Sequence, residues 1–64
     1  MDHSVANIMR FFEFDHLPDN LKVVSSHFWE LACHLEATLP TGPEKSVALR
    51  KLLESKDAAV RAAL

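Results

Sequence analysis

The side chains best suited to chemistry lie in one short segment, residues 41–46, whose sequence is Thr-Gly-Pro-Glu-Lys-Ser. Its glycine and proline predict the start of a helix, where free backbone N–H groups and the helix dipole can hold a phosphate. The segment adds two hydroxyls and a lysine, and an arginine one turn later can bind a phosphate through both arms of its guanidinium. The alternative is an ordinary capped helix with a solvated charged face, in which Glu44 opposes an anion. The candidate anion-binding residues are Thr41, Lys45, Ser46 and Arg50.

An aromatic stretch, residues 11–17, supplies a second group of candidates. The rings of Phe12, Phe14 and His16 can stack on nucleobases, a contact worth about 1–3 kcal/mol per base that tolerates any base. The alternative is that these rings fill the core of a protein with little else to bury. Trp29 is expected to be a packing residue on the helix that follows.

Metal binding and catalysis are not expected. His27 and His34 are seven residues apart, which separates them by two helical turns, about 10 Å, and no histidine pair has the i, i+4 spacing of a metal site. A single glycine leaves no phosphate loop, nucleophile elbow or dinucleotide fingerprint, and a single cysteine cannot form an internal disulfide. We therefore expect a protein that is not an enzyme and that needs no metal and no cofactor.

The formal net charge of −2 is unevenly distributed along the chain. Residues 1–39 carry two basic and six acidic side chains, whereas residues 40–64 carry five basic and three acidic ones. An anionic ligand is therefore expected to meet the C-terminal segment. The negative total argues against a general binder of DNA or RNA polymers.

Prolines divide the chain into the elements that must position these residues. Apolar residues at steps of three and four predict two helices, over residues 18–39 and 43–64, in a single domain. The second helix begins either with a Thr41–Glu44 capping box or with Gly42 as the cap and Pro43 as the first helical residue. Residues 1–17 are expected to be a short helix or an extended segment. The short connection between the long helices predicts an all-α, antiparallel two-helix hairpin.

The chain length has a consequence for assembly. A domain of 64 residues buries too little surface to be very stable alone, and it has no internal disulfide or zinc site to help. The second helix is also apolar over more than one stripe, so we expect a homo-oligomer. No apolar run approaches the roughly 20 residues that span a bilayer, and the start lacks the features of a signal peptide, which predicts a cytosolic protein without a membrane partner.

The order of these motifs resembles a known family. An aromatic segment with His-Leu-Pro, a helix that contains Leu31-Ala32, and the run from Leu39 to Ala62 are similar to the phage anti-CBASS sponges, whose helical hairpin is shared with the phage anti-Thoeris sponges. The resemblance covers residues 12–64, and its most distinctive part is residues 40–53. Many members of that family carry an arginine where this chain has Ser25. The resemblance therefore does not carry over one phosphate contact, the one made by that arginine.

The resemblance implies a function. Such sponges are oligomers, hexameric in characterised members, that bind cyclic di- and trinucleotide immune messengers in pockets between subunits and withhold them from their effector without cleaving them. It implies that Thr41, Lys45, Ser46 and Arg50 meet phosphate or ribose, and that Phe14 and His16 occupy the place of a Tyr-His-Pro-like segment. The expected location is the cytoplasm of the infected bacterium. The alternative from another class is a helical module that inhibits a host protein by direct contact.

Overall fold

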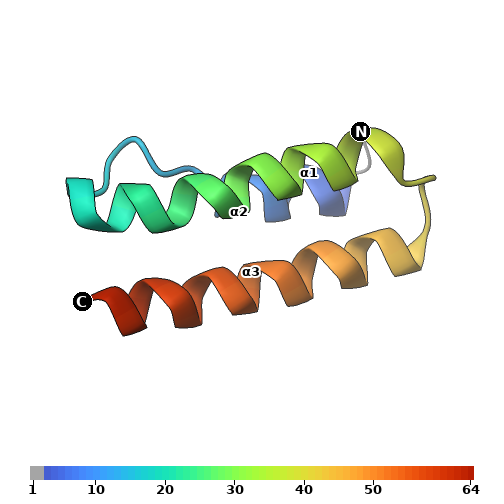
Figure 1. Ribbon diagram of the computed structural model, residues 1–64. Helices are drawn as coiled ribbons and strands as arrows, with labels where there is room; N and C mark the ends of the chain where they lie inside the picture. Colours follow the sequence, from blue (N-terminus) through green and yellow to red (C-terminus); the bar gives the residue numbers. More distant parts are fainter. Residues whose placement is uncertain (1–2) are drawn as a thin grey trace.

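The structure of this protein is a computed structural model that describes residues 3–64. Within these residues the chain forms three α-helices. They are α1 (His3–Arg10), α2 (Asp19–Thr38) and α3 (Pro43–Ala63). The two long helices lie side by side and run in opposite directions, and α3 packs against both α2 and α1 (Figure 1). The described residues contain no β-strand, so the predicted all-α class is confirmed.

Both ends of α2 follow from prolines. Pro18 is the N-cap residue, and Asp19 places an acid in the first turn, where it interacts favourably with the helix dipole. At the other end Leu39 is extended, with φ −83° and ψ 139°, because the ring of Pro40 disfavours a helical conformation in the residue before it. The helix is therefore one residue shorter at each end than predicted.

The start of α3 decides between the two predicted caps. Gly42 is the N-cap residue, Pro43 is the first helical residue, and no side chain makes a capping hydrogen bond. The Thr41–Glu44 capping box is therefore wrong. Proline suits this position because its missing N–H lies among those that have no partner inside a helix and its φ is already helical. At the C-terminal end the helix stops at Ala63, one residue earlier than predicted.

The N-terminal segment is helical in its first part, as one of the two predictions had it, and forms turns in the rest. It is helical through α1, which ends in a tight turn where the N–H groups of Phe11 and Phe12 bond to carbonyls three residues earlier. The chain is irregular from there to Pro18, apart from a turn in which the N–H of Leu17 donates to the carbonyl oxygen of Phe14 across 3.0 Å. This turn carries Asp15 and His16 at its tip.

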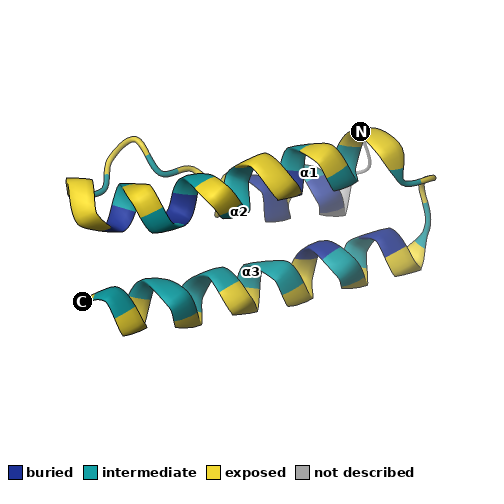
Figure 2. Ribbon diagram, in the orientation of Figure 1, coloured by how far each residue is buried: buried dark blue, intermediate teal, exposed yellow. Residues whose placement is uncertain are grey.

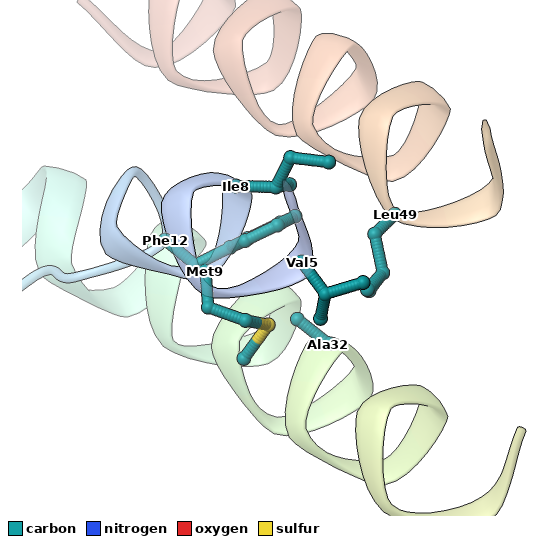
Figure 3. Packing of buried hydrophobic residues seen from close by; sticks show 6 residues of the cluster. All are labelled: Val5, Ile8, Met9, Phe12, Ala32 and Leu49. Atoms are coloured by element: carbon teal, nitrogen blue, oxygen red, sulfur yellow. The ribbon is translucent and has the colours of Figure 1, made fainter. Parts of the chain in front are cut away.

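The core forms where the three helices meet. Its buried side chains are Val5, Ile8, Met9, Phe12, Ala32 and Leu49 (Figure 3). Most of them come from α1 and the residues just after it, because the spacing of the α1 residues puts them on one face of the helix. The long helices each contribute one buried residue to this cluster, so α1 and the turn after it supply four of its six members.

Burial is uneven along α3. In α3 the buried residues are Lys45 and Leu49, both near its start, and its later residues are half-buried or exposed (Figure 2). The apolar side chains of Leu52, Leu53 and Val60 therefore remain partly open to solvent. The three-helix unit leaves much of the predicted apolar face of α3 incompletely covered.

Candidate functional site

The loop between the long helices and the start of α3 surround a cleft of about 410 Å³. We call it the loop cleft; it is lined by Leu39, Pro40, Thr41, Gly42, Pro43, Glu44, Lys45 and Ala48. Two predicted anion-binding residues, Thr41 and Lys45, thus line one cavity. Ser46 is half-buried and Arg50 is exposed, and neither lines the cleft.

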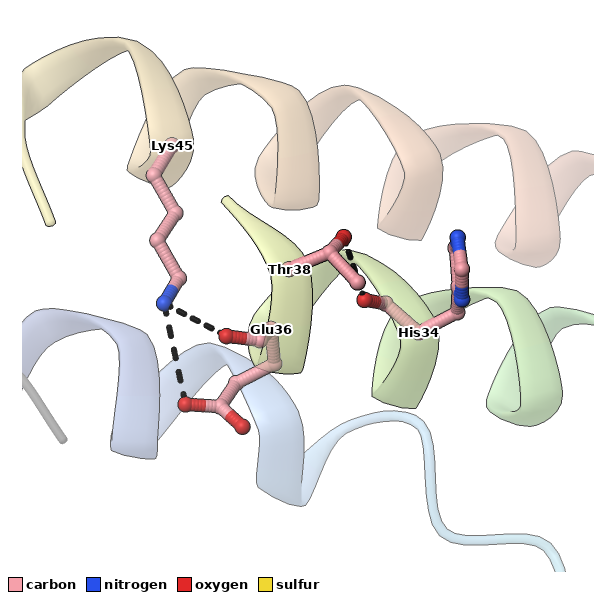
Figure 4. A network of polar contacts seen from close by, with 4 residues as sticks. All are labelled: His34, Glu36, Thr38 and Lys45. Carbon is pink, nitrogen blue, oxygen red and sulfur yellow. Dashed lines mark hydrogen bonds and ion pairs between the residues drawn. The ribbon is translucent and has the colours of Figure 1, made fainter. Parts of the chain in front are cut away.

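Lys45 is not a solvated cation. It is only 8% exposed, and its ammonium donates a hydrogen bond to the backbone carbonyl oxygen of Glu36 across 2.7 Å (Figure 4). The same nitrogen lies 3.7 Å from Oε1 of the Glu36 carboxylate. In this chain the charge of Lys45 joins the start of α3 to the end of α2.

The sequence explains why this carbonyl needs a donor from outside its helix. In an α-helix the carbonyl of Glu36 would accept from the N–H of residue 40, but residue 40 is a proline and has no N–H. One residue earlier the pattern is intact, since the N–H of Leu39 donates to the carbonyl of Leu35. Lys45 therefore replaces the hydrogen bond that Pro40 removes.

Arg50 is in the opposite situation to Lys45. Its side chain is exposed and makes no hydrogen bond or ion pair with any residue that the structure describes. A guanidinium with five N–H donors and no partner among the described residues is available to an incoming anion. Of the two predicted cations, Arg50 is thus the one whose whole charge faces solvent.

The aromatic half of the predicted site lies in a different place. Phe14 and His16 line a second cleft, of about 350 Å³, together with Glu13, Asp15 and Trp29. We call this the aromatic–acidic cleft. Phe14 and Trp29 are half-buried, and the other three residues are exposed. The cleft thus combines two carboxylates with three rings.

The structure also separates the aromatic residues by role. Phe12 is fully buried in the core, so its ring is not available to a ligand. Phe14 and His16 lie at the surface and remain candidates for base stacking. The core interpretation is therefore confirmed for Phe12, and base stacking stays a prediction for Phe14 and His16.

Phe14 also lines a third, shallower cleft of about 300 Å³. Its other lining residues are Asp19, Lys22, Val23 and Ser26, all from the first part of α2. The ring of Phe14 thus stands between the aromatic–acidic cleft and a cleft that contains a lysine.

The loop cleft and the aromatic–acidic cleft are separate within one chain. The loop cleft and the aromatic–acidic cleft share no lining residue. Residues 11–18 run along the first half of α2, whereas the loop of residues 39–42 lies beyond its other end (Figure 1).

Seven residues that were not predicted as site residues line clefts with Phe14, among them Glu13, Asp15, Lys22 and Trp29. Glu13, Asp15 and Lys22 were counted only as charges, and Trp29 was assigned to packing. Trp29 does pack against the core, but part of it also lines the aromatic–acidic cleft. The sequence signal was available for Glu13 and Asp15, because they alternate with Phe14 and His16 in a segment without helical spacing.

The chain matches no family model, no curated protein and no solved structure. Within residues 3–64, no three His, Cys, Asp or Glu side chains gather in a way that could hold a metal ion. Over the same residues, no helix has both the length and the apolar character needed to cross a membrane.

Proposed function

We propose that this protein is a phage anti-defence sponge that binds cyclic di- or trinucleotide immune messengers and sequesters them without cleaving them. It acts as a homo-oligomer, a hexamer by its resemblance to the anti-CBASS sponges, in the cytoplasm of the infected bacterium. Its hairpin of α2 and α3 is the repeating unit. The motif of residues 39–62 and the separation of the aromatic–acidic cleft from the loop cleft support this proposal.

The separation of the two clefts is the observation that carries the proposal. A cyclic oligonucleotide has flat bases and charged phosphates, and each needs a different environment. Phe14 and His16 offer ring surfaces to a base, whereas Thr41, Ser46 and Arg50 offer hydroxyls and a guanidinium to phosphate or ribose. Because the two clefts are separate in one chain, the proposal places the ligand in a pocket between two chains, where both clefts can contact it.

Lys45 can take part without losing its place in the fold. An ammonium has three N–H donors, of which one bonds to the Glu36 carbonyl. A phosphate at the loop cleft would replace the 3.7 Å contact with the Glu36 carboxylate and leave that backbone bond intact. Lys45 thus both holds the loop and contributes charge in this proposal.

The partly covered α3 supports assembly. The helix has no buried residue after Leu49, although Leu52, Leu53 and Val60 lie in that part. Burying apolar surface contributes about 25 cal/mol per Å², so further copies packed on this helix would stabilise a domain too small to be very stable alone. Multi-angle light scattering at micromolar concentration should give a multiple of 7.2 kDa. A folded monomer would overturn the proposed assembly.

Titration calorimetry against a panel of cyclic di- and trinucleotides tests the binding function. We expect heat and a fixed ratio of ligand to chain with at least one member, and the same ligand recovered intact after release. A bound ligand should also raise the melting temperature, because it binds only the folded state. If no member of the panel gives binding heat at high protein concentration, the proposed sponge function is wrong.

The second candidate, contact inhibition of a host protein, is favoured by two exposed apolar residues on α2, Val23 at 64% and Leu31 at 45%. The two functions differ in what they need from the start of α3. A sponge loses binding when Thr41, Ser46 and Arg50 are replaced by alanine, whereas a contact inhibitor that uses α2 tolerates these changes.

A further inference from the structure

The aromatic–acidic cleft has a composition that selects among ligand groups. Its lining contains the carboxylates of Glu13 and Asp15, the rings of Phe14, His16 and Trp29, and no lysine or arginine. The hydrogen bond between Leu17 and Phe14 closes the turn that carries Asp15, and the packing of Trp29 on the core fixes one wall. The cleft is therefore formed by a closed turn on one side and a packed helix residue on the other.

Charge decides which part of a nucleotide can enter. Two carboxylates repel a phosphate, so the phosphates of a bound ligand must lie outside this cleft. Lys22 lines the cleft on the other side of Phe14, and Arg50 is exposed on α3. What remains for the aromatic–acidic cleft is a base, which can stack on its rings.

The carboxylates then distinguish one base from another. An ionised carboxylate only accepts hydrogen bonds, and it can accept two in parallel. Guanine presents two adjacent N–H donors, at N1 and N2, on its Watson–Crick edge. Adenine and cytosine present one amino group beside a ring nitrogen that is an acceptor, and uracil presents one N–H between two carbonyls. These acceptors would face the carboxylate oxygens unfavourably.

We propose that the aromatic–acidic cleft is a guanine subsite, in which the base stacks on Phe14 and Trp29 and donates its N1–H and N2–H to the carboxylates of Glu13 and Asp15. This inference rests on the proposed function and adds the ligand class to it. The preferred messenger contains guanine, and messengers with only adenine bind more weakly. A paired contact of this kind gives roughly tenfold discrimination or more.

The test compares two cyclic dinucleotides, one with two guanines and one with two adenines, by titration calorimetry. We expect the native protein to bind the guanine ligand at least tenfold more tightly. The double variant Glu13→Gln, Asp15→Asn replaces acceptors by amides, which can both donate and accept. It should reduce the preference for guanine at least tenfold, because an amide can pair with the donor and acceptor of adenine.

A matched control separates recognition from net charge. The pair Glu54→Gln and Asp57→Asn makes the same two changes on α3, away from the cleft, and should leave the guanine preference unchanged. Equal changes in both double variants would overturn the guanine subsite, as would equal affinity of the native protein for the two ligands. If the native protein binds no cyclic nucleotide at all, the sponge function itself is wrong. That result is distinguishable from binding without a preference for guanine, which overturns only the guanine subsite.

A cationic side chain of another protein would satisfy the same carboxylates. Methylguanidinium is the probe for this occupant, because it carries two adjacent N–H donors and a positive charge. Under the proposal it fails to displace the guanine ligand at equal concentration. If it binds the native protein, loses binding in the Glu13→Gln, Asp15→Asn variant, and in large excess leaves the affinity for the guanine ligand unchanged, the guanine does not occupy this cleft and the guanine subsite is wrong.

Discussion

The ammonium of Lys45 and the backbone carbonyl of Glu36 join the two long helices at their loop. The distance is 2.7 Å, and both groups are at least partly buried. The carbonyl needs this donor because Pro40 cannot supply the N–H that would continue α2. One proline and one lysine thus fix how the loop closes.

Replacing Lys45 with Met tests this relationship. The variant keeps most of the aliphatic stem but removes the donor, so the Glu36 carbonyl loses its partner. Because hydrogen bonds to charged groups contribute about 1.5–3 kcal/mol, we expect the free energy of unfolding to fall by that amount. Urea unfolding followed by circular dichroism measures it, without any ligand present.

Glu36→Gln is the control for Lys45→Met. It removes the carboxylate, whose oxygen lies 3.7 Å from the ammonium, but leaves the backbone carbonyl in place. A partly exposed ion pair contributes about 0–1 kcal/mol, so this variant should be nearly as stable as the native protein. Equal losses in the two variants would show that the backbone hydrogen bond contributes nothing.

Ser25→Ala is expected to stabilise the protein. The Ser25 side chain is fully buried, and its hydroxyl has no hydrogen-bond partner among the described residues. Removing a buried unpaired hydroxyl recovers its desolvation penalty, on the order of 1 kcal/mol. Thermal unfolding should therefore show a higher melting temperature for the variant.

The neighbouring Ser26→Ala variant controls for the better helix propensity of alanine. The Ser26 hydroxyl already donates to the Val23 carbonyl within the helix, across 3.0 Å. Its replacement should change stability by less than Ser25→Ala does. If Ser25→Ala instead lowers stability, the hydroxyl has a partner in the assembled protein.

Leu49→Ala should unfold most of the protein. Leu49 is fully buried and is the residue by which α3 enters the core. A Leu→Ala change in a core costs about 2–5 kcal/mol, which is comparable to the whole stability of a domain this small. The control is Leu64→Ala, because Leu64 is 84% exposed. A cooperative, near-native unfolding curve for Leu49→Ala would contradict the three-helix core.

Arg50→Ala should weaken ligand capture without melting the fold. Its side chain is exposed and has no partner among the described residues, so its removal leaves nothing unpaired. We expect at least a tenfold loss of affinity for the cyclic nucleotide that binds best, with an unchanged melting temperature in the absence of ligand. Loss of helicity would mean that Arg50 is structural.

Lys51→Ala is the matched control for Arg50→Ala. It removes the same charge from the next residue of α3, where the exposed Lys51 lies 3.6 Å from Glu54. Its effect on affinity should be small and should disappear at high salt, because only long-range attraction changes. Equal losses in both variants would point to net charge and not to a contact by Arg50.

The sequence by itself determined the all-α class and the places where the long helices begin and end. Apolar residues at steps of three and four predict the two long helices. Pro18 and Pro40 limit the first of them and Pro43 begins the second, because a proline constrains the backbone only within a few residues. These are local effects, so they can be predicted without knowing how the helices pack.

Only the tertiary structure decided what each side chain does. Phe12 and Phe14 are two residues apart, yet one lies in the core and the other lines a cleft. Lys45 looked like a free cation, but its nearest partner lies nine residues earlier on another helix. Such outcomes depend on which faces of the helices meet, and helical periodicity defines a face without identifying its partner.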